Sequence, residues 1–269
     1  MKAACLQLHP VFGDPSGNMD RAEPYLRDAA QQGVQLIVLP ELYPTGYTMT
    51  SRAEAYDLAE TIPGGPSVRR LEQWARETGS FYVMGMAERA GDKVYNASVL
   101  VGPAGHISTY RKIHLFYKEN EWFDPGEEPP HVVEIACGAE RISIGMMICF
   151  DWIFPEMARS LALLGAQVVC HPSNLVLHFC QDAMVTRSIE NQVFTMTCNR
   201  IGTESRAGLD LTFTGGSQIT SPDGKVLGRC LPDVEGLISA EFDPARALNK
   251  NVTDYNHILN QRRSDLYRL

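Results

Sequence analysis

Strand-like and helix-like segments alternate along this chain of 269 residues, and that alternation restricts its fold more than any other feature. Continuous apolar runs predict buried strands over residues 2–8, 34–39, 81–87, 168–171 and 193–198. Apolar residues at helical spacing predict helices over residues 18–32, 66–78, 155–164 and 181–191. Because strand–helix–strand units place helices on the faces of a sheet, we expect an α/β fold.

Two predicted hairpins interrupt this alternation, one over residues 96–111 and one over residues 217–229. Hairpins add antiparallel strands, so the sheet structure is expected to be mixed. The segments 113–130 and 200–215 read as long loops, and long loops in a compact domain often carry function. A chain of this length is near the upper limit for one hydrophobic core, so we expect a single domain over residues 1–269.

The composition argues against nucleic-acid and membrane partners. The formal net charge is −8, and no Lys/Arg run could form a basic stripe. The N-terminus passes directly into a strand pattern without the apolar segment of a signal peptide. No apolar run reaches the roughly 18 residues that a membrane span needs. Seven cysteines without CxxC pairs fit reduced thiols, so we expect a cytoplasmic protein.

The most informative single residue is Cys149. It follows an apolar run that begins at Arg141, and a helix pattern with Pro155 near its start comes next. A thiol in such a turn lies at the C-terminal edge of a sheet, where a helix N-terminus favours the nucleophilic thiolate. The alternative is an inert buried cysteine, which is common in proteins.

Two charged residues also follow predicted strands. Glu41 comes after the run Leu36–Pro40, where partial burial raises a carboxyl pKa toward the range of a general base. A helix cap or a solvated acid is the alternative interpretation of Glu41. Lys112 ends the first hairpin, where an ammonium can lower a thiol pKa and stabilise an oxyanion. A lysine at that place can also simply protect a sheet edge.

Three strings around these residues closely resemble the signatures of the carbon–nitrogen hydrolase (nitrilase) superfamily. The strings are Pro40-Glu41-Leu42, Tyr110-Arg111-Lys112-Ile113-His114-Leu115 and Gly145-Met146-Met147-Ile148-Cys149-Phe150-Asp151. Their flanks match as well, with Phe123-Asp124-Pro125-Gly126 after the lysine and Phe154-Pro155-Glu156 after the cysteine. The resemblance runs in register and in order from Met1 to about Leu269.

That resemblance implies a four-layer α-β-β-α sandwich with two mixed sheets and acyl transfer without a metal or other cofactor. It implies that Cys149 is the nucleophile, Glu41 the general base and Lys112 the stabiliser of the oxyanion. A second glutamate in the loop after the lysine is expected to position Lys112 and the substrate amide nitrogen. Glu119 matches this place best, and Glu121 is the alternative.

Two further residues are candidates for contacts with the substrate. The backbone N–H of Phe150, next to the nucleophile, is expected to donate to the developing oxyanion. Asn174 ends a predicted strand in front of the apolar residues 175–177 and is placed to hydrogen-bond near the scissile group. Its alternative role is that of a turn residue.

The residues around the nucleophile favour an amidase within the superfamily. Nitrilases usually read Cys-Trp-Glu-His, whereas this chain reads Cys149-Phe150-Asp151-Trp152. Members acting on monoamides of dicarboxylic keto acids commonly have an Arg where this chain has Ile153. N-carbamoyl hydrolases tend to have basic residues near positions 175–177. We therefore expect a small-molecule substrate, a neutral aliphatic amide cleaved through a Cys thioester to a carboxylic acid and ammonia.

Several alternatives to this function stay open. Within the superfamily they are a nitrilase and an N-carbamoyl amide hydrolase, and outside catalysis a binding protein of the same fold. The spacing of His171 and His178, without an HExxH or CxxC motif, argues against a metal hydrolase. A Cys–His site using His114 or His171 is conceivable, although His114 is better interpreted as a hydrogen-bonded loop residue.

The C-terminal stretch 249–269 is polar and cannot form much core of its own. In the superfamily such tails often cross to a neighbouring subunit, and the helices after the nucleophile commonly form a dimer interface. The resemblance therefore implies a homodimer or higher homo-oligomer with this tail at the interface.

Overall fold

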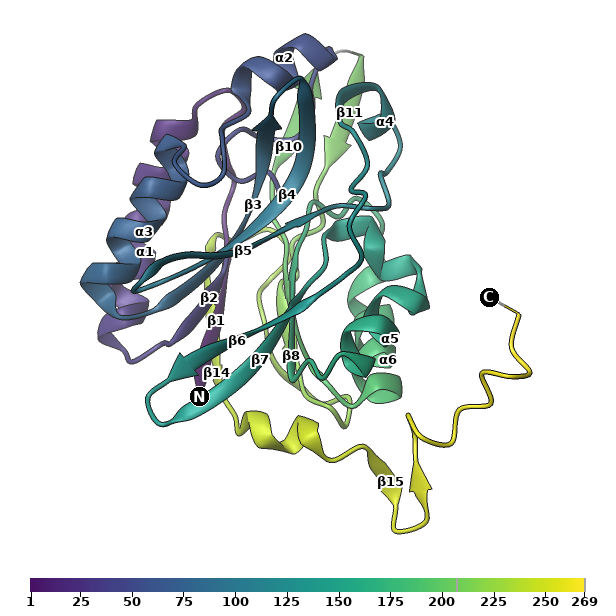
Figure 1. Ribbon diagram of the computed structural model, residues 1–269. Helices are drawn as coiled ribbons and strands as arrows, with labels where there is room; N and C mark the ends of the chain where they lie inside the picture. The colour runs from purple at the N-terminus through teal and green to yellow at the C-terminus, as the bar shows by residue number, and fades with distance from the viewer. Residues whose placement is uncertain (207, 269) are drawn as a thin grey trace.

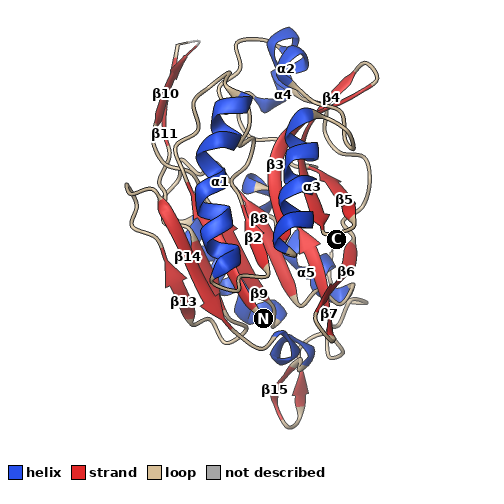
Figure 2. Ribbon diagram, turned by 90° about the vertical axis from the view of Figure 1, so that its left-hand side faces the viewer, coloured by secondary structure: helices blue, strands red, loops and turns tan. Residues whose placement is uncertain are grey.

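The computed structural model describes residues 1–206 and 208–268. Four helices form its two outer layers: α1 (Pro15–Gln31), α3 (Pro66–Thr78), α5 (Pro155–Leu163) and α6 (Cys180–Asn191). Two six-stranded sheets lie between them, with α1 and α3 over one sheet and α5 and α6 over the other (Figure 1; Figure 2). The expected α/β sandwich of four layers is confirmed.

The first sheet consists of β1 (Lys2–Gln7), β2 (Leu36–Val38), β3 (Phe81–Ala90), β4 (Lys93–Gly102), β5 (Gly105–Arg111) and β14 (Gly236–Glu241). Their order in space is β14–β1–β2–β3–β4–β5. Strands β1, β2 and β3 are parallel neighbours, and the other pairs are antiparallel. The sheet is mixed, as the hairpin over residues 96–111 predicts.

The second sheet consists of β6 (Val132–Cys137), β7 (Glu140–Met146), β8 (Val168–Pro172), β9 (Phe194–Cys198), β12 (Gln218–Thr220) and β13 (Val226–Arg229). Their order in space is β13–β12–β9–β8–β7–β6. Strands β7, β8 and β9 are parallel, and the outer pairs are antiparallel. The two sheets therefore repeat one pattern of strand directions, although the outer strand next to the parallel three comes last in the chain in one sheet (β14) and first in the other (β6).

Apolar side chains hold the layers together. The cluster that joins the two sheets includes Ala3, Cys5, Val38, Val83, Ile144, Cys170 and Met196, all buried. A separate cluster beneath α1 and α3 includes Leu6, Leu26, Ile37, Leu71 and Trp74. Because both faces of each parallel strand are buried, those strands read as continuous apolar runs in the sequence.

Both predicted long loops contain regular structure, so the expectation of unstructured loops is wrong. The segment after Lys112 forms the single-turn helix α4 (Glu119–Trp122), and the segment after residue 200 forms β10 (Thr203–Arg206) and β11 (Leu209–Thr212). A further helix, α2 (Arg52–Leu58), also lacked a clear sequence signal. Elements this short depend on tertiary contacts: Leu209 and Leu211 pack against a buried cluster that includes Trp122.

The C-terminal tail follows the short helix η2 (Pro244–Leu248) and contains the small strands β15 (Asn251–Thr253) and β16 (Asn256–His257). In Figure 1 it leaves the body of the molecule at the lower right. Its side chains are mostly exposed, and Tyr255 is 88% exposed. The single domain over residues 1–269 and the position of this tail at an oligomer interface stay predictions.

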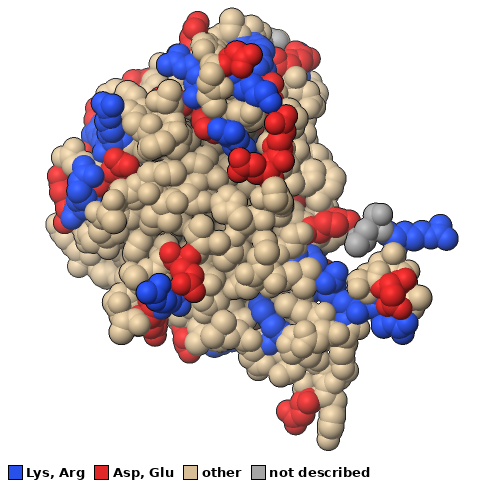
Figure 3. All heavy atoms as spheres, in the orientation of Figure 1, with Lys and Arg blue, Asp and Glu red and all other residues tan. Residues whose placement is uncertain are grey.

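Charged side chains on the face shown in Figure 3 form small groups in which both signs occur. A broad area with neither acidic nor basic side chains lies across the middle of that face. A continuous basic stripe of the kind that binds nucleic acids is not seen on this face. Among the described residues, no helix is both long and apolar enough to cross a membrane.

Candidate active site

Three buried charged side chains meet at one edge of the first sheet. Lys112 directly follows β5, Glu41 comes three residues after β2, and Glu119 begins α4. The Lys112 ammonium donates to Glu41 Oε1 at 2.7 Å and to Glu119 Oε1 at 2.8 Å. All three side chains are fully buried. Glu121, the alternative to Glu119, lies at the exposed surface.

Two glycines allow the backbone to reach these positions. Gly85 on β3 donates its N–H to the Pro40 carbonyl, and an added Cβ there would lie 2.4 Å from the Cα of Glu41. Gly126 donates its N–H to the Lys112 carbonyl, and an added Cβ would lie 2.3 Å from the carbonyl oxygen of Arg111. The Pro-Gly pair after the lysine therefore has a steric role in placing Lys112.

Two other side chains complete the charged cluster, and sequence reasoning missed both. Asn96 on β4 donates to Glu41 Oε1 at 2.7 Å. The Tyr47 hydroxyl donates to Glu119 Oε1 at 2.8 Å. Both residues are buried. Their places in an apolar strand and in the loop after Glu41 carry no local signal of a site.

Cys149 belongs to the second sheet. It follows β7 as the first residue of the short helix η1 (Cys149–Ile153), and its φ of 42° is in the left-handed region that non-glycine residues rarely adopt. The Asp151 carboxylate holds this turn by accepting the Ile148 N–H and the Tyr110 hydroxyl, each at 2.8 Å. The sequence identified Cys149 but not the buried carboxylate and hydroxyl that support it.

The histidines considered for a Cys–His pair have other partners. His114 Nδ1 lies 2.8 Å from Asp151 Oδ1, and the ring stacks on Phe154 at 3.8 Å between centroids. His171 Nε2 lies 2.8 Å from the carbonyl oxygen of Cys149. His114 is thus the hydrogen-bonded loop residue that the sequence indicated. Within the described residues, no group of three or more His, Cys, Asp or Glu side chains is arranged to hold a metal ion.

The surroundings of Cys149 do not favour the thiolate that the sequence predicts. Burial raises the pKa of its thiol well above the usual value, and the Glu41 charge raises it further. Lys112 lowers the pKa, but Glu119 adds a second carboxylate that opposes this effect. The unliganded site therefore favours the protonated thiol. Burial and two carboxylates oppose the ionised sulfur that an ammonium and a helix N-terminus favour, and the thiolate stays a prediction.

Lys112 and Glu119 respond to the same surroundings in different ways. Burial lowers the pKa of Lys112, but the charges of Glu119 and Glu41 outweigh it and raise the pKa overall. Burial raises the pKa of Glu119, although the Lys112 ammonium opposes this shift. Lys112 is therefore a fixed cation of the site at physiological pH.

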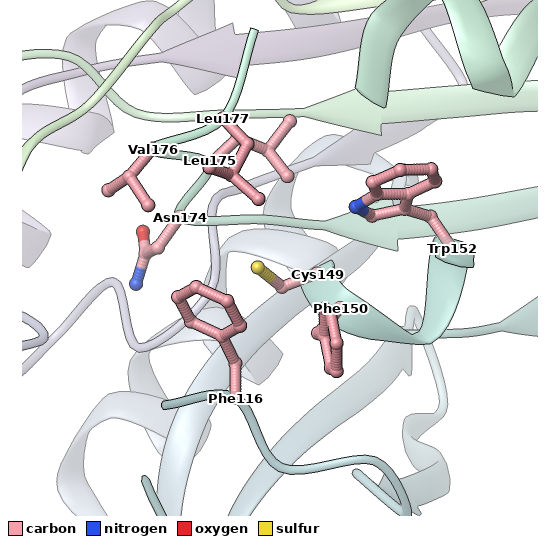
Figure 4. Close-up of a pocket in the computed structure, with 8 residues that line it drawn as sticks. All are labelled: Phe116, Cys149, Phe150, Trp152, Asn174, Leu175, Val176 and Leu177. Atoms are coloured by element: carbon pink, nitrogen blue, oxygen red, sulfur yellow. The ribbon is translucent and has the colours of Figure 1, made fainter. Parts of the chain in front are cut away.

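The Cys149 sulfur borders a small hollow whose own volume is about 10 Å³, room for about one water molecule. The lining residues are Phe116, Cys149, Phe150, Trp152, Asn174, Leu175, Val176 and Leu177. Figure 4 shows the sulfur between the Phe116 ring and the segment Asn174–Leu177, with Phe150 and Trp152 on the near side of η1. None of these eight residues carries a charged side chain, so the hollow fits a small neutral group.

Several buried polar atoms at the site have no hydrogen-bond partner among the described residues. They are Glu41 Oε2, both side-chain polar atoms of Asn174, and Asn96 Oδ1. A buried polar atom without a partner is costly and usually has a functional reason. The N–H of Phe150 is also available, because the first N–H groups of a helix lack partners within it. These atoms can receive the polar end of a substrate.

A buried carboxylate–ammonium–carboxylate cluster after strands of one sheet lies near enough to a cysteine of the other for its charges to shift the Cys149 pKa. Residues 2–249 match the family model described as carbon-nitrogen hydrolase. The chain belongs to the carbon–nitrogen hydrolase family, within the nitrilase superfamily. It is therefore a carbon–nitrogen hydrolase, and its resemblance to that superfamily is confirmed.

Named relatives within the family differ in the substrates that their names indicate. The chain is 43% identical to a nitrilase of Pyrococcus abyssi, over 99% of each chain. It is 32% identical to an (R)-stereoselective amidase of Pseudomonas sp., over 97% of this chain and 92% of the relative. A crystal structure of an amidase from Nesterenkonia sp. superimposes with a TM-score of 0.82 at 26% identity, covering 99% of this chain and 94% of that one.

Proposed function

We propose that this protein hydrolyses small neutral aliphatic amides to a carboxylic acid and ammonia through a thioester on Cys149. The observation that carries the proposal is an uncharged hollow lined by Cys149 and by the unpartnered Asn174 side chain, with Glu41, whose Oε2 is also unpartnered, near enough for its charge to raise the Cys149 pKa. An amide group has N–H donors for Glu41 Oε2 and a carbonyl oxygen for the Phe150 N–H. An apolar acyl chain would contact Phe116, Trp152 and Leu177, which line the hollow.

In the first half of the reaction Glu41 acts as general base. It takes the thiol proton as the sulfur attacks the amide carbon, which is necessary because the raised pKa of Cys149 keeps the thiol protonated. The carbonyl π electrons move to oxygen, where Lys112 and the Phe150 N–H stabilise the oxyanion. The carbon–nitrogen bond then breaks, Glu41 passes the proton to nitrogen, and ammonia leaves.

In the second half, water hydrolyses the thioester. Glu41 removes a proton from the water as its oxygen attacks the acyl carbon. The carbon–sulfur bond breaks, and the proton on Glu41 returns to the Cys149 sulfur as the acid leaves. Amide and water are thus converted to acid and ammonia with the enzyme restored, and the covalent step divides one difficult displacement into two easier ones.

Glu119 has a supporting role in this proposal. Its carboxylate and that of Glu41 hold the Lys112 ammonium from two sides, and the Tyr47 hydroxyl fixes Glu119 in turn. A cation held in this way does not need to reorganise when negative charge develops on the substrate, which is the condition for strong electrostatic catalysis. Asn174 is proposed to bind the substrate through its unpartnered side-chain amide.

The named relatives support a small amide substrate. One structure of the Nesterenkonia amidase contains butyramide, and another has acrylamide added at the active-site cysteine. Both molecules are small and neutral. The hollow of this chain has the same character, since its lining has no side chain to pair with a charged substrate.

Nitrile hydrolysis is the second candidate, because the chain is 43% identical to a protein named nitrilase. The same thiol could add to a nitrile carbon to form a thioimidate, which takes up one water molecule and loses ammonia to give the thioester. A nitrile nitrogen only accepts hydrogen bonds, however, so it leaves the acceptor Glu41 Oε2 unused. N-carbamoyl hydrolysis has weaker support, from 29% identity to an N-carbamoylputrescine amidase of Solanum lycopersicum.

The experiment compares butyramide, butyronitrile and N-carbamoylputrescine as substrates, with ammonia release as the readout. We expect kcat/KM for butyramide to exceed that for either other compound by about 10-fold or more, because only butyramide combines a neutral chain with amide donors. Mass spectrometry of quenched enzyme should find a butyryl group on Cys149. A higher kcat/KM for butyronitrile would replace the amidase proposal with the nitrilase one.

The cellular setting and assembly are also proposals. All seven cysteines have free thiols, which supports work in the reducing cytoplasm. We propose a homodimer or higher homo-oligomer with the tail at the interface, because exposed apolar side chains such as Leu163, Ile189 and Leu266 occur on α5, α6 and the tail. Removal of residues 250–269 should reduce the number of subunits in the assembly, which light scattering measures.

A further inference from the structure

The orientation of one peptide group decides whether the nucleophile has an oxyanion donor beside it. The Cys149–Phe150 peptide is trans. In a planar trans peptide the C=O and N–H bonds point in opposite directions. Whatever binds the Cys149 carbonyl therefore also sets the direction of the Phe150 N–H.

The side chain that binds this carbonyl is His171, at the end of β8. Its Nε2 lies 2.8 Å from the Cys149 carbonyl oxygen, and the ring is completely buried. A carbonyl oxygen only accepts hydrogen bonds, so Nε2 must carry the ring proton and donate. Burial lowers the pKa of His171 to about 4, which keeps the ring neutral at physiological pH.

Other contacts fix the ring in the plane that this bond needs. His171 Nδ1 lies 3.2 Å from Thr197 Oγ1 on β9, and the Thr197 hydroxyl donates to it in the tautomer just described. Ser173 Oγ lies 3.2 Å from the carbonyl oxygen of His171 and 3.1 Å from Nε2. The ring is thus held from β9 and from the turn after β8, without a free rotation.

We propose that His171 is a positioning residue that aims the Phe150 N–H at the oxyanion by holding the Cys149 carbonyl. The inference rests on the proposed function, which gives Phe150 its role as donor. It adds His171, at the end of β8, to the residues that support the reaction. A hydrogen bond to the carbonyl also polarises the peptide, so the Phe150 N–H becomes a stronger donor.

The left-handed conformation of Cys149 makes such a support necessary. A non-glycine residue at φ 42° costs energy that the surroundings must offset. Asp151 holds the backbone before the cysteine through the Ile148 N–H. His171 holds the backbone after it, so the strained residue is fixed on both sides.

The test compares His171→Gln with His171→Asn. The glutamine amide can reach the position of Nε2 and donate to the Cys149 carbonyl, whereas the shorter asparagine reaches only toward Thr197. We expect His171→Asn to lower kcat about 10- to 100-fold at nearly unchanged KM, because loss of one oxyanion donor costs about 10²–10³-fold. His171→Gln should recover activity to within about 5-fold of wild type.

Two further measurements separate positioning from general damage to the nucleophile. Butyraldehyde adds to the thiol to form a thiohemiacetal, in which the sulfur bonds to carbon and the thiol proton ends on oxygen. Its inhibition constant should rise in His171→Asn by about the factor that kcat/KM falls, as for a transition-state analogue. Alkylation by iodoacetamide displaces iodide and forms no oxyanion, so its rate should change less than 3-fold.

His106→Gln is the matched control, because His106 Nε2 also bonds a hydroxyl, that of Thr109 on β5, away from the site. It should behave as wild type in all three assays. Equal activity of His171→Asn and wild type, or an equal loss in hydrolysis and in alkylation, would overturn the proposal. Failure of wild type to release ammonia from butyramide would instead refute the proposed function.

Discussion

The two sheets have the same pattern of strand directions, but one supplies charged side chains to the site and the other supplies the thiol and an amide. In the first sheet the segments after β2 and β5 supply Glu41 and Lys112, and these charges are already paired. In the second sheet the segments after β7 and β8 supply Cys149 and Asn174, and the polar atoms of Asn174 have no partner. The first sheet therefore supplies charges that are mostly paired with one another, with Glu41 Oε2 left open, and the second supplies the nucleophile and the unpartnered amide of Asn174.

This difference shows how a repeated fold can hold an asymmetric site. The strand ends are equivalent positions in the two sheets, so each offers a place for a functional side chain at the same edge. Burial of the two carboxylates depends on the ammonium that both of them contact. The nucleophile needed the opposite, an apolar surrounding with free space beside the sulfur.

The largest effect is expected when the nucleophile that the second sheet supplies is removed. Cys149→Ala should lower amide turnover on the order of 10⁴-fold or more, because the covalent route is lost. Its free energy of unfolding should change by less than about 1 kcal/mol, since no buried charge loses a partner. Ammonia release and urea titration measure these effects. Cys170→Ala, a buried thiol on β8, is the control and should retain turnover.

The next effect tests the first sheet. Lys112→Met should abolish turnover and also destabilise the fold by about 3–5 kcal/mol, because it leaves two buried carboxylates without their cation. Urea titration measures the loss. Lys93→Met is the control, because Lys93 pairs with Glu127 at the surface and should contribute about 0–1 kcal/mol. A loss for Lys112→Met as small as for the control would contradict the distinction between the sheets.

A fall in pH should destabilise the fold through protonation of His171 in the second sheet. The folded-state pKa is about 4, below the ordinary value of 6.5, so the unfolded chain binds the proton more readily. Stability from this group is complete above about pH 6.5 and is lost as the pH falls toward 4, by about 2–3 kcal/mol. The difference in urea stability between wild type and His171→Gln should shrink by that amount between pH 7 and 4.5. A constant difference would contradict the buried neutral ring.

The smallest effect concerns Asn174. Asn174→Ala should lower kcat/KM about 2- to 10-fold, the value of one hydrogen bond, mainly through KM. Stability should stay unchanged, because the side-chain amide has no partner to lose in the unliganded protein. Substrate titration and urea titration give the two numbers. Unchanged kinetics with a loss of stability would assign Asn174 to the turn instead of the substrate.

Much of the framework could be predicted from the sequence. The strands and helices around the site have apolar periodicity of their own, so the segments ending before Glu41 and Cys149 were recognised locally. The helix over residues 66–78 has the predicted bounds, and the strand beginning at Phe81 extends to Ala90. Glu41, Lys112 and Cys149 each follow a predicted strand, whereas Glu119 was expected only from the resemblance to the superfamily.

The supporting side chains could not be predicted, for a physical reason. Tyr47, Asn96, Asp151 and His171 act through hydrogen bonds to elements far away in the chain. A buried asparagine in an apolar strand gives no sign of a function in the sequence, because its hydrogen-bond partner lies far away in the chain. The protonation of Cys149 depends on burial and on the total charge around it, which no local motif records.

The docking of the two sheets has a consequence for turnover. The base and the sulfur come from different layers, so their separation is set by the apolar seam and not by either layer alone. A slide of one layer against the other would leave each layer intact and still spoil the reaction, because catalysis is sensitive to shifts of about 1 Å. Substitutions at Val38 or Met196, remote from any ligand, should therefore cause small changes in the rate of catalysis.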